Sequence, residues 1–368
     1  MSSADNATPP APRRRRWITA NQVTVLRILA LPFPFWALVT RPADHIMWVA
    51  FFFGALVGMT DFVDGWMARR DGPTTLGALL DPVADKLFIA MLLIPIVAHR
   101  ECPGWAAGVL FVRELLITSL RSSMAVREQN LKTSQLGKLK TVVQMGGIGA
   151  FFLVIFVPGE AMRWTMFVLA VIFALLAVGW YVRRKVLPLW LGATPFLIAS
   201  LFVAATLHPG TDTAMRADVG TFVFLLMVVF TWISGFDYLT GSVRAFRATG
   251  GVSRPDVIRV LWSFAHGLAL VPLLGALPEL TVPVTISLCA ELSLGGVENL
   301  VAAERRRWAK GSVMPTFMAA VVVGVAAWLS LAPVGVLLIA AWGLAVFSVV
   351  NLVVAFVLDR DVFLTTKT

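Results

Sequence analysis

Cysteine and histidine, the side chains that most often hold transition metals in proteins, are rare in this chain. It has 2 cysteines and 4 histidines among 368 residues. Two thiols are too few for a thiolate metal centre, and Cys102 and Cys289 fall in a loop and in an apolar segment, where we expect no disulfide. The histidines are scattered, so no two of them share a helix face as paired zinc ligands would. These absences exclude zinc chemistry based on cysteine or paired histidine.

Charged residues are also scarce, and apolar residues dominate. Only 14% of the residues are charged, 58% are hydrophobic, and the mean hydropathy is +0.82. A single soluble core of this length would not need so much apolar surface. Apolar runs at residues 164–182, 317–331 and 334–358 approach or exceed the length that crosses a hydrocarbon core of about 30 Å as a helix. We therefore expect an all-α polytopic membrane protein with about twelve spans.

The net charge of +10 is concentrated in alternate loops. The basic loops lie at residues 13–16, 69–70, 121–140, 183–185, 244–259, 305–310 and 360. The loops between them offer only Arg41, Arg100, Arg163 and Arg216. By the positive-inside rule the basic set faces the cytoplasm, so we expect an inner-membrane protein with both termini on the cytoplasmic side. No aromatic-basic module accompanies the positive charge, so nucleic acid is not an expected partner.

Three regions are expected along the chain. Residues 1–17, which end in a run of arginines, are expected to form a disordered basic tail, and residues 18–246 a catalytic membrane domain. The glycine- and arginine-rich stretch 244–255 predicts a boundary, after which residues 255–368 form a four-helix membrane bundle. The role of this bundle stays open between an oligomer interface, lipid binding and a second activity.

Two glutamates in that bundle share one face of a mostly apolar helix. Glu291 and Glu298 are seven residues apart, close to Gly295 and Gly296. An intramembrane carboxylate is a functional candidate because its charge is expensive to bury. Glu298 is also placed to pair with a basic group such as Arg305 at the membrane interface. The sequence leaves both interpretations open.

Four aspartates at the ends of two apolar segments carry the strongest functional signal: Asp61, Asp64, Asp81 and Asp85. A charge in or beside a bilayer costs several kcal/mol unless it is compensated. On helices, each pair of aspartates falls on a single face, so two helices are expected to present the carboxylates to each other. A set of carboxylate oxygens without His or Cys suits two Mg²⁺ or Mn²⁺ ions. Such a pair of ions can clamp a pyrophosphate and stabilise its leaving oxygens.

The sequence around these aspartates reads Asp61-x2-Asp64-Gly65-x2-Ala68-Arg69, followed by Gly77-x3-Asp81-x3-Asp85. It resembles the signature of the CDP-alcohol phosphotransferases, which join an alcohol to a phosphate released from a CDP-linked donor. The resemblance implies that Asp61, Asp64 and Asp81 hold two divalent ions, while Asp85 shares a metal and accepts the proton of the attacking hydroxyl. It also implies a CDP pocket formed by Asp64, Gly65, Ala68, Arg69 and Gly77, with Asn21 and Thr24 nearby.

Other segments resemble one branch of that family, the phosphatidylglycerophosphate synthases. They are Asn21-x2-Thr24-x2-Arg27, the run from Arg113 to Arg121, Gly137-Lys138-x-Lys140, and residues 232–239. The resemblance covers residues 18–246, with two extra helices near 162–207. Independently of it, Arg113, Arg121, Lys138 and Lys140 place cations on the expected cytoplasmic ends of two helices. An acceptor that carries a phosphate needs such cations, and a neutral acceptor does not.

The resemblance thus implies transfer of a phosphatidyl group from CDP-diacylglycerol to sn-glycerol 3-phosphate, with release of CMP, in phospholipid biosynthesis at a lipid membrane. Proteins of this kind are commonly homodimers. One alternative is a related enzyme with another acceptor, such as inositol phosphate or phosphatidylglycerol. Another is a transporter or scaffold in which the acidic cluster binds cations without turnover.

Overall fold

The computed structural model describes residues 19–71, 74–129, 147–154, 156–157, 159–310 and 314–364. The tail at residues 1–17 lies outside these ranges. Within the helices, some side chains are also not described, among them those of Asp64, Ala68, Arg69 and Asp237. Every regular element in the described ranges is a helix, so the predicted all-α class is confirmed.

The chain begins with five helices that hold the acidic motif and its surroundings: α1 Ala20–Ala30, α2 Pro32–Thr40, α3 Asp44–Asp71, α4 Thr75–Ala98 and α5 Gly104–Val126. After a helical segment at residues 147–154 come α7 Gly159–Arg184, α8 Leu189–Leu207 and α9 Asp212–Ala248. The last part contains α10 Arg254–Phe264, the short helices η1 Ala265–Leu270, η2 Val271–Gly275 and η3 Pro278–Leu280, then α11 Thr281–Arg305, α12 Met314–Trp328, α13 Val334–Leu358 and α14 Arg360–Leu364.

Six helical stretches of the described residues are long and apolar enough to cross a membrane. They are 20–40, 159–184, 212–248, 254–275, 278–305 and 334–358. The protein is therefore a polytopic membrane protein. Helices α3 and α4, in which aspartates interrupt the apolar sequence, are not among the six, and the prediction of about twelve spans is not confirmed.

The apolar segment at residues 20–40 is divided into two helices. Helix α1 begins at a capping box in which Thr19 and Gln22 bond each other's backbone, and it ends at Leu31, directly before Pro32. Proline has no N–H to donate and suits the first turn of a helix, so α2 starts there. The break leaves α1 as a short helix whose polar residues lie against α3 and α4.

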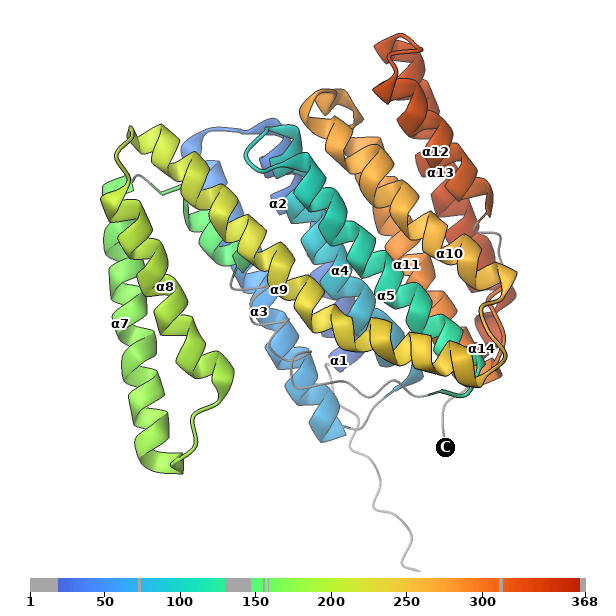
Figure 1. Ribbon diagram of the computed structural model, residues 1–368, viewed down its shortest axis with the longest axis horizontal. Helices are drawn as coiled ribbons and strands as arrows, with labels where there is room; N and C mark the ends of the chain where they lie inside the picture. Colours follow the sequence, from blue (N-terminus) through green and yellow to red (C-terminus); the bar gives the residue numbers. More distant parts are fainter. Residues whose placement is uncertain are drawn as a thin grey trace, which may run out of the picture.

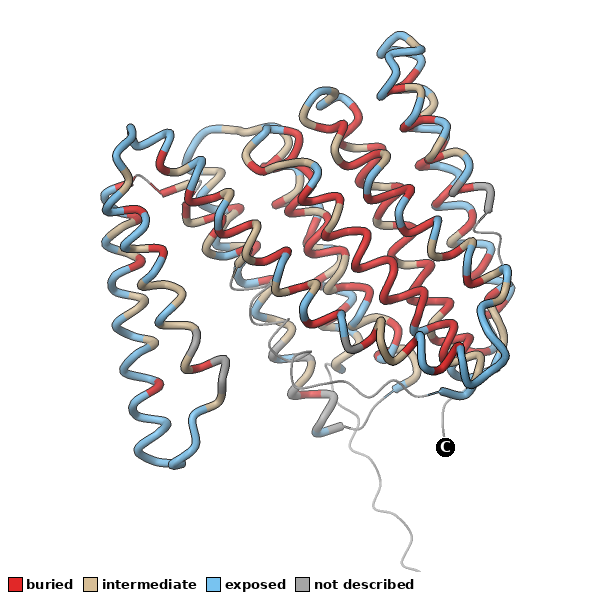
Figure 2. The backbone as a smooth tube through the Cα atoms, viewed as in Figure 1, coloured by how far each residue is buried: buried red, intermediate tan, exposed pale blue. Residues whose placement is uncertain are grey.

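The core of the molecule is built on α4, α5 and α11, whose backbones are mostly buried in Figure 2. Helix α11 comes from the far end of the chain, yet it packs against both α4 and α5. One hydrophobic cluster includes Leu93 of α4, Phe111 of α5 and Leu288 of α11. The carboxy-terminal helices are therefore joined to the acidic helices by a continuous core.

Helices α7 and α8 pack against each other at the left edge of Figure 1. They occupy the region near residues 162–207 where the sequence predicts two helices. Most of α7 is exposed, and its exposed side chains include Leu175, Leu176 and Tyr181. Because lipid is as apolar as these side chains, such a surface suits contact with the hydrocarbon of a bilayer.

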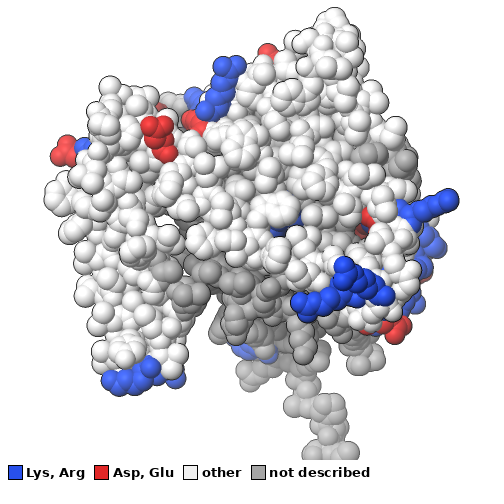
Figure 3. All heavy atoms as spheres, in the orientation of Figure 1, with Lys and Arg blue, Asp and Glu red and all other residues white. Residues whose placement is uncertain are grey.

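On the face drawn in Figure 3, charged side chains lie mainly toward the upper and lower edges, and most of the surface between them is uncharged. At the lower edge lie the carboxy-terminal end of α7, which carries Arg183 and Arg184, and the carboxy-terminal end of α3. This is the distribution expected of a membrane protein, and it places the motif-bearing end of α3 at the same edge as a basic loop.

Candidate active site

The acidic motif lies on two helices that both contact α1. Asp61 and the backbone of Asp64 belong to α3, while Asp81 and Asp85 belong to α4. Helix α4 starts where the Thr74 hydroxyl accepts a hydrogen bond of 2.9 Å from the Gly77 N–H. The predicted arrangement of two helices contributing the carboxylates agrees with this placement.

Arg27 of α1 joins the two acidic helices. Its Nη1 atom lies 2.7 Å from Asp61 Oδ1 and 3.3 Å from Asp85 Oδ1. The Arg27 side chain is only 1% exposed, whereas those of Asp61 and Asp85 are 28% and 37% exposed. One buried cation therefore holds a carboxylate from each helix, and the outer parts of both carboxylates remain accessible.

The other polar residues of α1 also contact α4. The Thr24 hydroxyl donates to Asp81 Oδ1 at 3.0 Å. One turn earlier, Asn21 Oδ1 accepts a 3.0 Å hydrogen bond from Thr74, the residue that caps α4. Thr24 was predicted to lie near CDP, and in the structure its hydroxyl orients a predicted metal ligand.

Gly77 is the point at which α1 comes closest to the start of α4. A Cβ atom at this position would lie 2.9 Å from both Asn21 Oδ1 and Thr74 Oγ1. A Cβ atom there would displace the Asn21 amide and the Thr74 hydroxyl and so disturb the hydrogen bond between them. The glycine leaves room for this contact between α1 and the start of α4.

The described carboxylates suit divalent cations in their chemistry. Asp61, Asp81 and Asp85 offer hard oxygen ligands on helices that are held together by α1. Among the side chains that the structure describes, however, no three acidic, His or Cys groups come close enough together to form a metal site. The fourth predicted ligand, Asp64, is outside that set, and Arg27 supplies the positive charge between Asp61 and Asp85.

The predicted acceptor-phosphate residues differ in their surroundings. Arg113 is 3% exposed and lies near the middle of α5, not at its end as expected. It donates to the Thr231 carbonyl at 3.0 Å, to Glu114 at 3.0 Å and to the Ser234 hydroxyl at 3.2 Å. The guanidinium of Arg113 is therefore engaged by protein groups.

Arg121 lies nearer than Arg113 to the carboxy-terminal end of α5, and it is exposed. Its Nη2 atom donates to the Tyr238 hydroxyl at 2.8 Å, and the guanidinium stands 4.8 Å from the centre of the Tyr238 ring. Both arginines thus contact α9, and Arg121 is the one that is open to a ligand. Lys138 and Lys140, the other predicted members of this set, lie outside the described residues.

Comparison with known proteins supports the resemblance seen in the motif. The family model described as CDP-alcohol phosphatidyltransferase matches residues 17–178. The CDP-diacylglycerol--glycerol-3-phosphate 3-phosphatidyltransferase of Yersinia pestis is 34% identical over 173 residues, a match that covers 41% of this chain and 89% of the relative. The chain belongs to the CDP-alcohol phosphatidyltransferase family. It is accordingly a phosphatidyltransferase by family.

Two further relatives match over shorter lengths. A protein of the same name from Cereibacter sphaeroides is 32% identical over 37% of this chain and 64% of the relative. A probable phosphatidylglycerophosphate synthase from Mycobacterium tuberculosis is 36% identical over 36% of this chain and 65% of its own length. This chain thus spans slightly less than two thirds of these two relatives. No solved structure matches it.

The family match stops within α7, so the helices from α8 onward must be interpreted from the structure. In this part, Glu298 does form the ion pair that the sequence allowed, but its partner is Arg259 of α10 and not Arg305. The two side chains are 2.8 Å apart and both are buried, and the Arg259 guanidinium also lies 3.7 Å from the centre of the Trp308 ring. A buried and paired carboxylate of this kind is a structural element.

Glu291 has a different environment. It lies near the middle of α11 and is fully buried. Within the described residues, neither of its carboxyl oxygens has a hydrogen-bond partner that meets normal geometry. The side chains of Ser348, Thr316 and Trp262 surround it.

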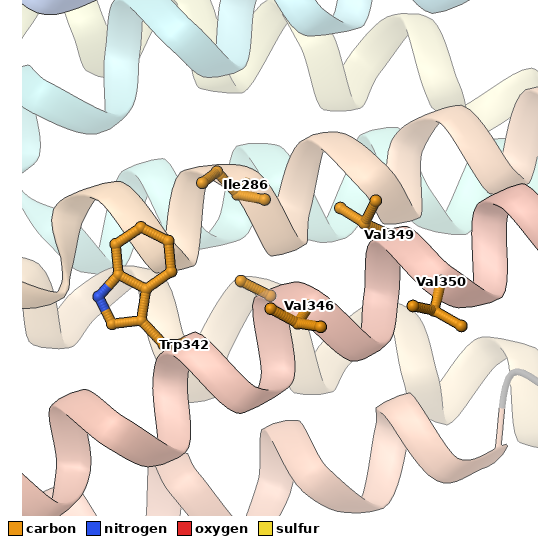
Figure 4. A pocket seen from close by; sticks show the side chains of 6 residues that line it. Ile286, Trp342, Val346, Val349 and Val350 are labelled. Carbon is orange, nitrogen blue, oxygen red and sulfur yellow. The ribbon is translucent and has the colours of Figure 1, made fainter.

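A surface groove between α11 and α13 contains only apolar contacts. Ile286 of α11 faces Trp342, Val346, Val349 and Val350 of α13 (Figure 4). No ionisable side chain lines it, so it has no group that could bind a phosphate or a nucleotide. The groove suits an acyl chain or a neighbouring apolar helix.

Two residues of the site region were not predicted as functional. Arg27 was quoted only as part of a resemblance, although its spacing from Asn21 and Thr24 already placed the three on neighbouring turns of α1. Lys86 directly follows Asp85 and donates to the Thr118 hydroxyl of α5. A lysine within an apolar helix was the available signal, since such a charge needs a local partner.

Proposed function

We propose that this enzyme transfers a phosphatidyl group from CDP-diacylglycerol to sn-glycerol 3-phosphate and releases CMP. The observation that carries the proposal is the convergence of Asp61 and Asp85, from separate helices, on one buried arginine. The names of the relatives from Yersinia pestis and Cereibacter sphaeroides support this choice of substrates.

In the proposed reaction, a hydroxyl oxygen of glycerol 3-phosphate forms a bond to the phosphatidyl phosphorus. The bond from that phosphorus to the CMP oxygen breaks, and the hydroxyl proton passes to Asp85. Asp85 is suited to this step because its side chain is 37% exposed while Arg27 fixes one of its oxygens. A general base must be within reach of the proton it accepts and held in position.

Asp61, Asp64 and Asp81 would hold two Mg²⁺ or Mn²⁺ ions together with Asp85. Bound ions of this kind supply neutralising charge on a pyrophosphate and its leaving oxygen. The chain's own contribution is to hold the ligands, and Thr24 does so for Asp81 through its 3.0 Å hydrogen bond. The residues proposed to line the CDP pocket are Gly65, Ala68, Arg69 and Gly77, with Asn21 at its edge.

For the acceptor phosphate we propose Arg121 as the main described contact, together with Lys138 and Lys140. Arg121 is exposed and carries further N–H donors beyond the one that contacts Tyr238. Arg113, proposed for the same set, would need to exchange a protein partner for phosphate. We further propose that the active site faces the cytoplasm and that two copies form a homodimer.

The test is an acceptor panel. The purified full-length protein is supplied with CDP-diacylglycerol, Mg²⁺ and one of glycerol 3-phosphate, inositol phosphate, phosphatidylglycerol or no acceptor, and CMP release is measured. We expect release with glycerol 3-phosphate alone. Release only with another acceptor would overturn the proposed substrate while leaving the family chemistry intact.

A substitution at Asp85 distinguishes an enzyme from a scaffold that only binds cations. Asp85→Asn keeps the shape of the side chain and removes its basicity, so CMP release should fall by at least about a thousandfold if it accepts the proton. The protein should still be folded, as judged by gel filtration and thermal unfolding in detergent. Wild-type turnover in Asp85→Asn would contradict the assigned role of this carboxylate.

A further inference from the structure

Helix α4 is enclosed from two opposite sides. Asp81 and Asp85 face α1, where they meet Thr24 and Arg27. Leu79 and Val83 lie half a helical turn away, on the opposite face, and meet α11. The position of α4, and with it that of Asp81 and Asp85, is therefore set on one side by α1. On the other side it is set by α11, which lies outside the family match.

The contact between α4 and α11 depends on glycine. A Cβ atom at Gly296 would overlap Val83 Cγ2 and would also come within 3.3 Å of Leu79 Cδ1. At this point the backbone of α11 rests directly on the side chains of α4. Any side chain on residue 296 would separate the two helices by tenths of an ångström or more.

The neighbouring glycine makes the same kind of contact with α5. A Cβ atom at Gly295 would lie 2.8 Å from Thr118 Cγ2. The hydroxyl of the same threonine accepts the hydrogen bond from Lys86, the residue that follows Asp85 on α4. One turn further along α5, the Ser122 hydroxyl donates to Asn299 of α11 at 2.9 Å.

Thr118 is thus shared by three helices. Its backbone is in α5, its methyl group lies against Gly295 of α11, and its hydroxyl holds Lys86 of α4. The hydroxyl also donates back to the Glu114 carbonyl at 2.6 Å, which fixes its rotamer. A shift of α11 would move Thr118, and through Lys86 it would move the turn of α4 that carries Asp85.

We propose that α11 is a positioning element of the phosphatidyl-transfer site, which seats α4 through Gly296 and α5 through Gly295, with Thr118 as the residue that links them to the turn bearing Asp85. The inference rests on the proposed function for its activity readout. Its physical basis is that displacement of reacting groups by about 1 Å can cost a hundredfold in rate. Gly295, Gly296 and Thr118 are positioning residues and touch no substrate.

The first test is a size exchange between α11 and α4. Gly296→Ala introduces the overlap with Val83, and the double variant Gly296→Ala/Val83→Ala removes the atoms that cause it. Gly343→Ala on α13, where a Cβ would meet nothing within 4 Å, is the matched control for helix propensity. We expect Gly296→Ala to lower kcat by about ten- to a hundredfold with little change in KM, and the double variant to regain most of the loss.

A second measurement does not depend on turnover. Mn²⁺ binding to the purified variants, followed by electron paramagnetic resonance, reports the relative placement of the carboxylates. Affinity should fall in Gly296→Ala, recover in the double variant and remain at the wild-type value in Gly343→Ala. Absence of CMP release by the wild-type protein would sink the proposed function, whereas unchanged Mn²⁺ affinity and kcat in Gly296→Ala would sink the positioning role.

The second size exchange addresses Thr118. Gly295→Ala should impair the enzyme, and Thr118→Ser should rescue it, because serine lacks the Cγ2 atom yet keeps the hydroxyl that holds Lys86. Thr118→Ala relieves the same overlap but loses the hydroxyl, so it should not rescue Gly295→Ala. Equal activity of the two double variants would overturn the assigned role of the hydroxyl, and thermal unfolding in detergent identifies any variant that fails to fold.

Discussion

Arg27 and Asp61 form an ion pair of 2.7 Å in which the arginine is buried and the aspartate is partly open to solvent. The same nitrogen reaches Asp85 on the next helix. Arg27 is thus a cation within a site that is proposed to bind metal cations. Arg27 must either share the carboxylates with the metals or compensate their charge when the metals are absent.

Replacement of Arg27 tests these two roles. Arg27→Ala leaves Asp61 and Asp85 without their buried partner, and because both carboxylates are partly exposed we expect a loss of about 1–3 kcal/mol in stability. Thermal unfolding in detergent should show a larger loss in EDTA than in Mg²⁺, since the metal can replace the missing charge. An equal loss in both conditions would mean that Arg27 does not substitute for a metal.

Removal of the Thr24 hydroxyl should weaken the site without unfolding the protein. Thr24→Ala deletes the hydrogen bond to Asp81, which is worth about 1–2 kcal/mol to a charged acceptor, or roughly a 5- to 30-fold loss in kcat/KM. Thr24→Ser retains the hydroxyl and is the matched control. CMP release at several Mg²⁺ concentrations should show that the alanine variant needs more metal. A change that is the same in both variants would point to the lost methyl group.

Metal dependence is the broadest expectation for the acidic cluster. Chelation by EDTA should abolish CMP release, and Mg²⁺ or Mn²⁺ should restore it, because the ligands are all carboxylates. Zn²⁺, which favours nitrogen and sulfur ligands, should restore little. Full activity after exhaustive chelation would contradict a two-metal mechanism.

The Arg259–Glu298 pair predicts a stability effect remote from catalysis. Both side chains are buried, so Arg259→Met should cost about 3–5 kcal/mol by leaving Glu298 buried and unpaired. The double variant Arg259→Met/Glu298→Gln should recover more than half of that loss. Glu279→Gln, at an exposed position just before the same helix, should change stability by less than about 0.5 kcal/mol. Urea unfolding in detergent followed by tryptophan fluorescence measures all three.

The helices and the acidic motif could be predicted because both depend on local sequence. In α4 Thr75–Ala98 and α5 Gly104–Val126, an apolar run with a threonine or a proline directly before it defines each helix. The placement of the aspartates on two neighbouring helices, α3 and α4, followed from the two apolar segments that carry them. The break at Leu31 was harder to predict, because Pro32 favours a break there while the apolar run on both sides of it favours a continuous helix.

Partner choice was not predictable in the same way. Glu298 pairs with Arg259, which lies 39 positions earlier in the chain, whereas proximity in the sequence favoured Arg305. The middle position of Arg113 likewise depends on where α5 starts and on which carbonyl of α9 faces it. The packing of α11 on α4 involves residues more than two hundred positions apart in the chain. The periodicity of a single sequence carries no information on such a contact.

Helix α9 has 37 residues, which corresponds to a length of about 55 Å. A hydrocarbon core is about 30 Å thick, so α9, whose diagonal course can be followed in Figure 1, must either extend beyond the core or lie tilted in it. Tilt changes with bilayer thickness, and Tyr238, which holds Arg121, is carried on this helix. A change in the thickness of the lipid matrix would therefore bear on the residue that holds Arg121.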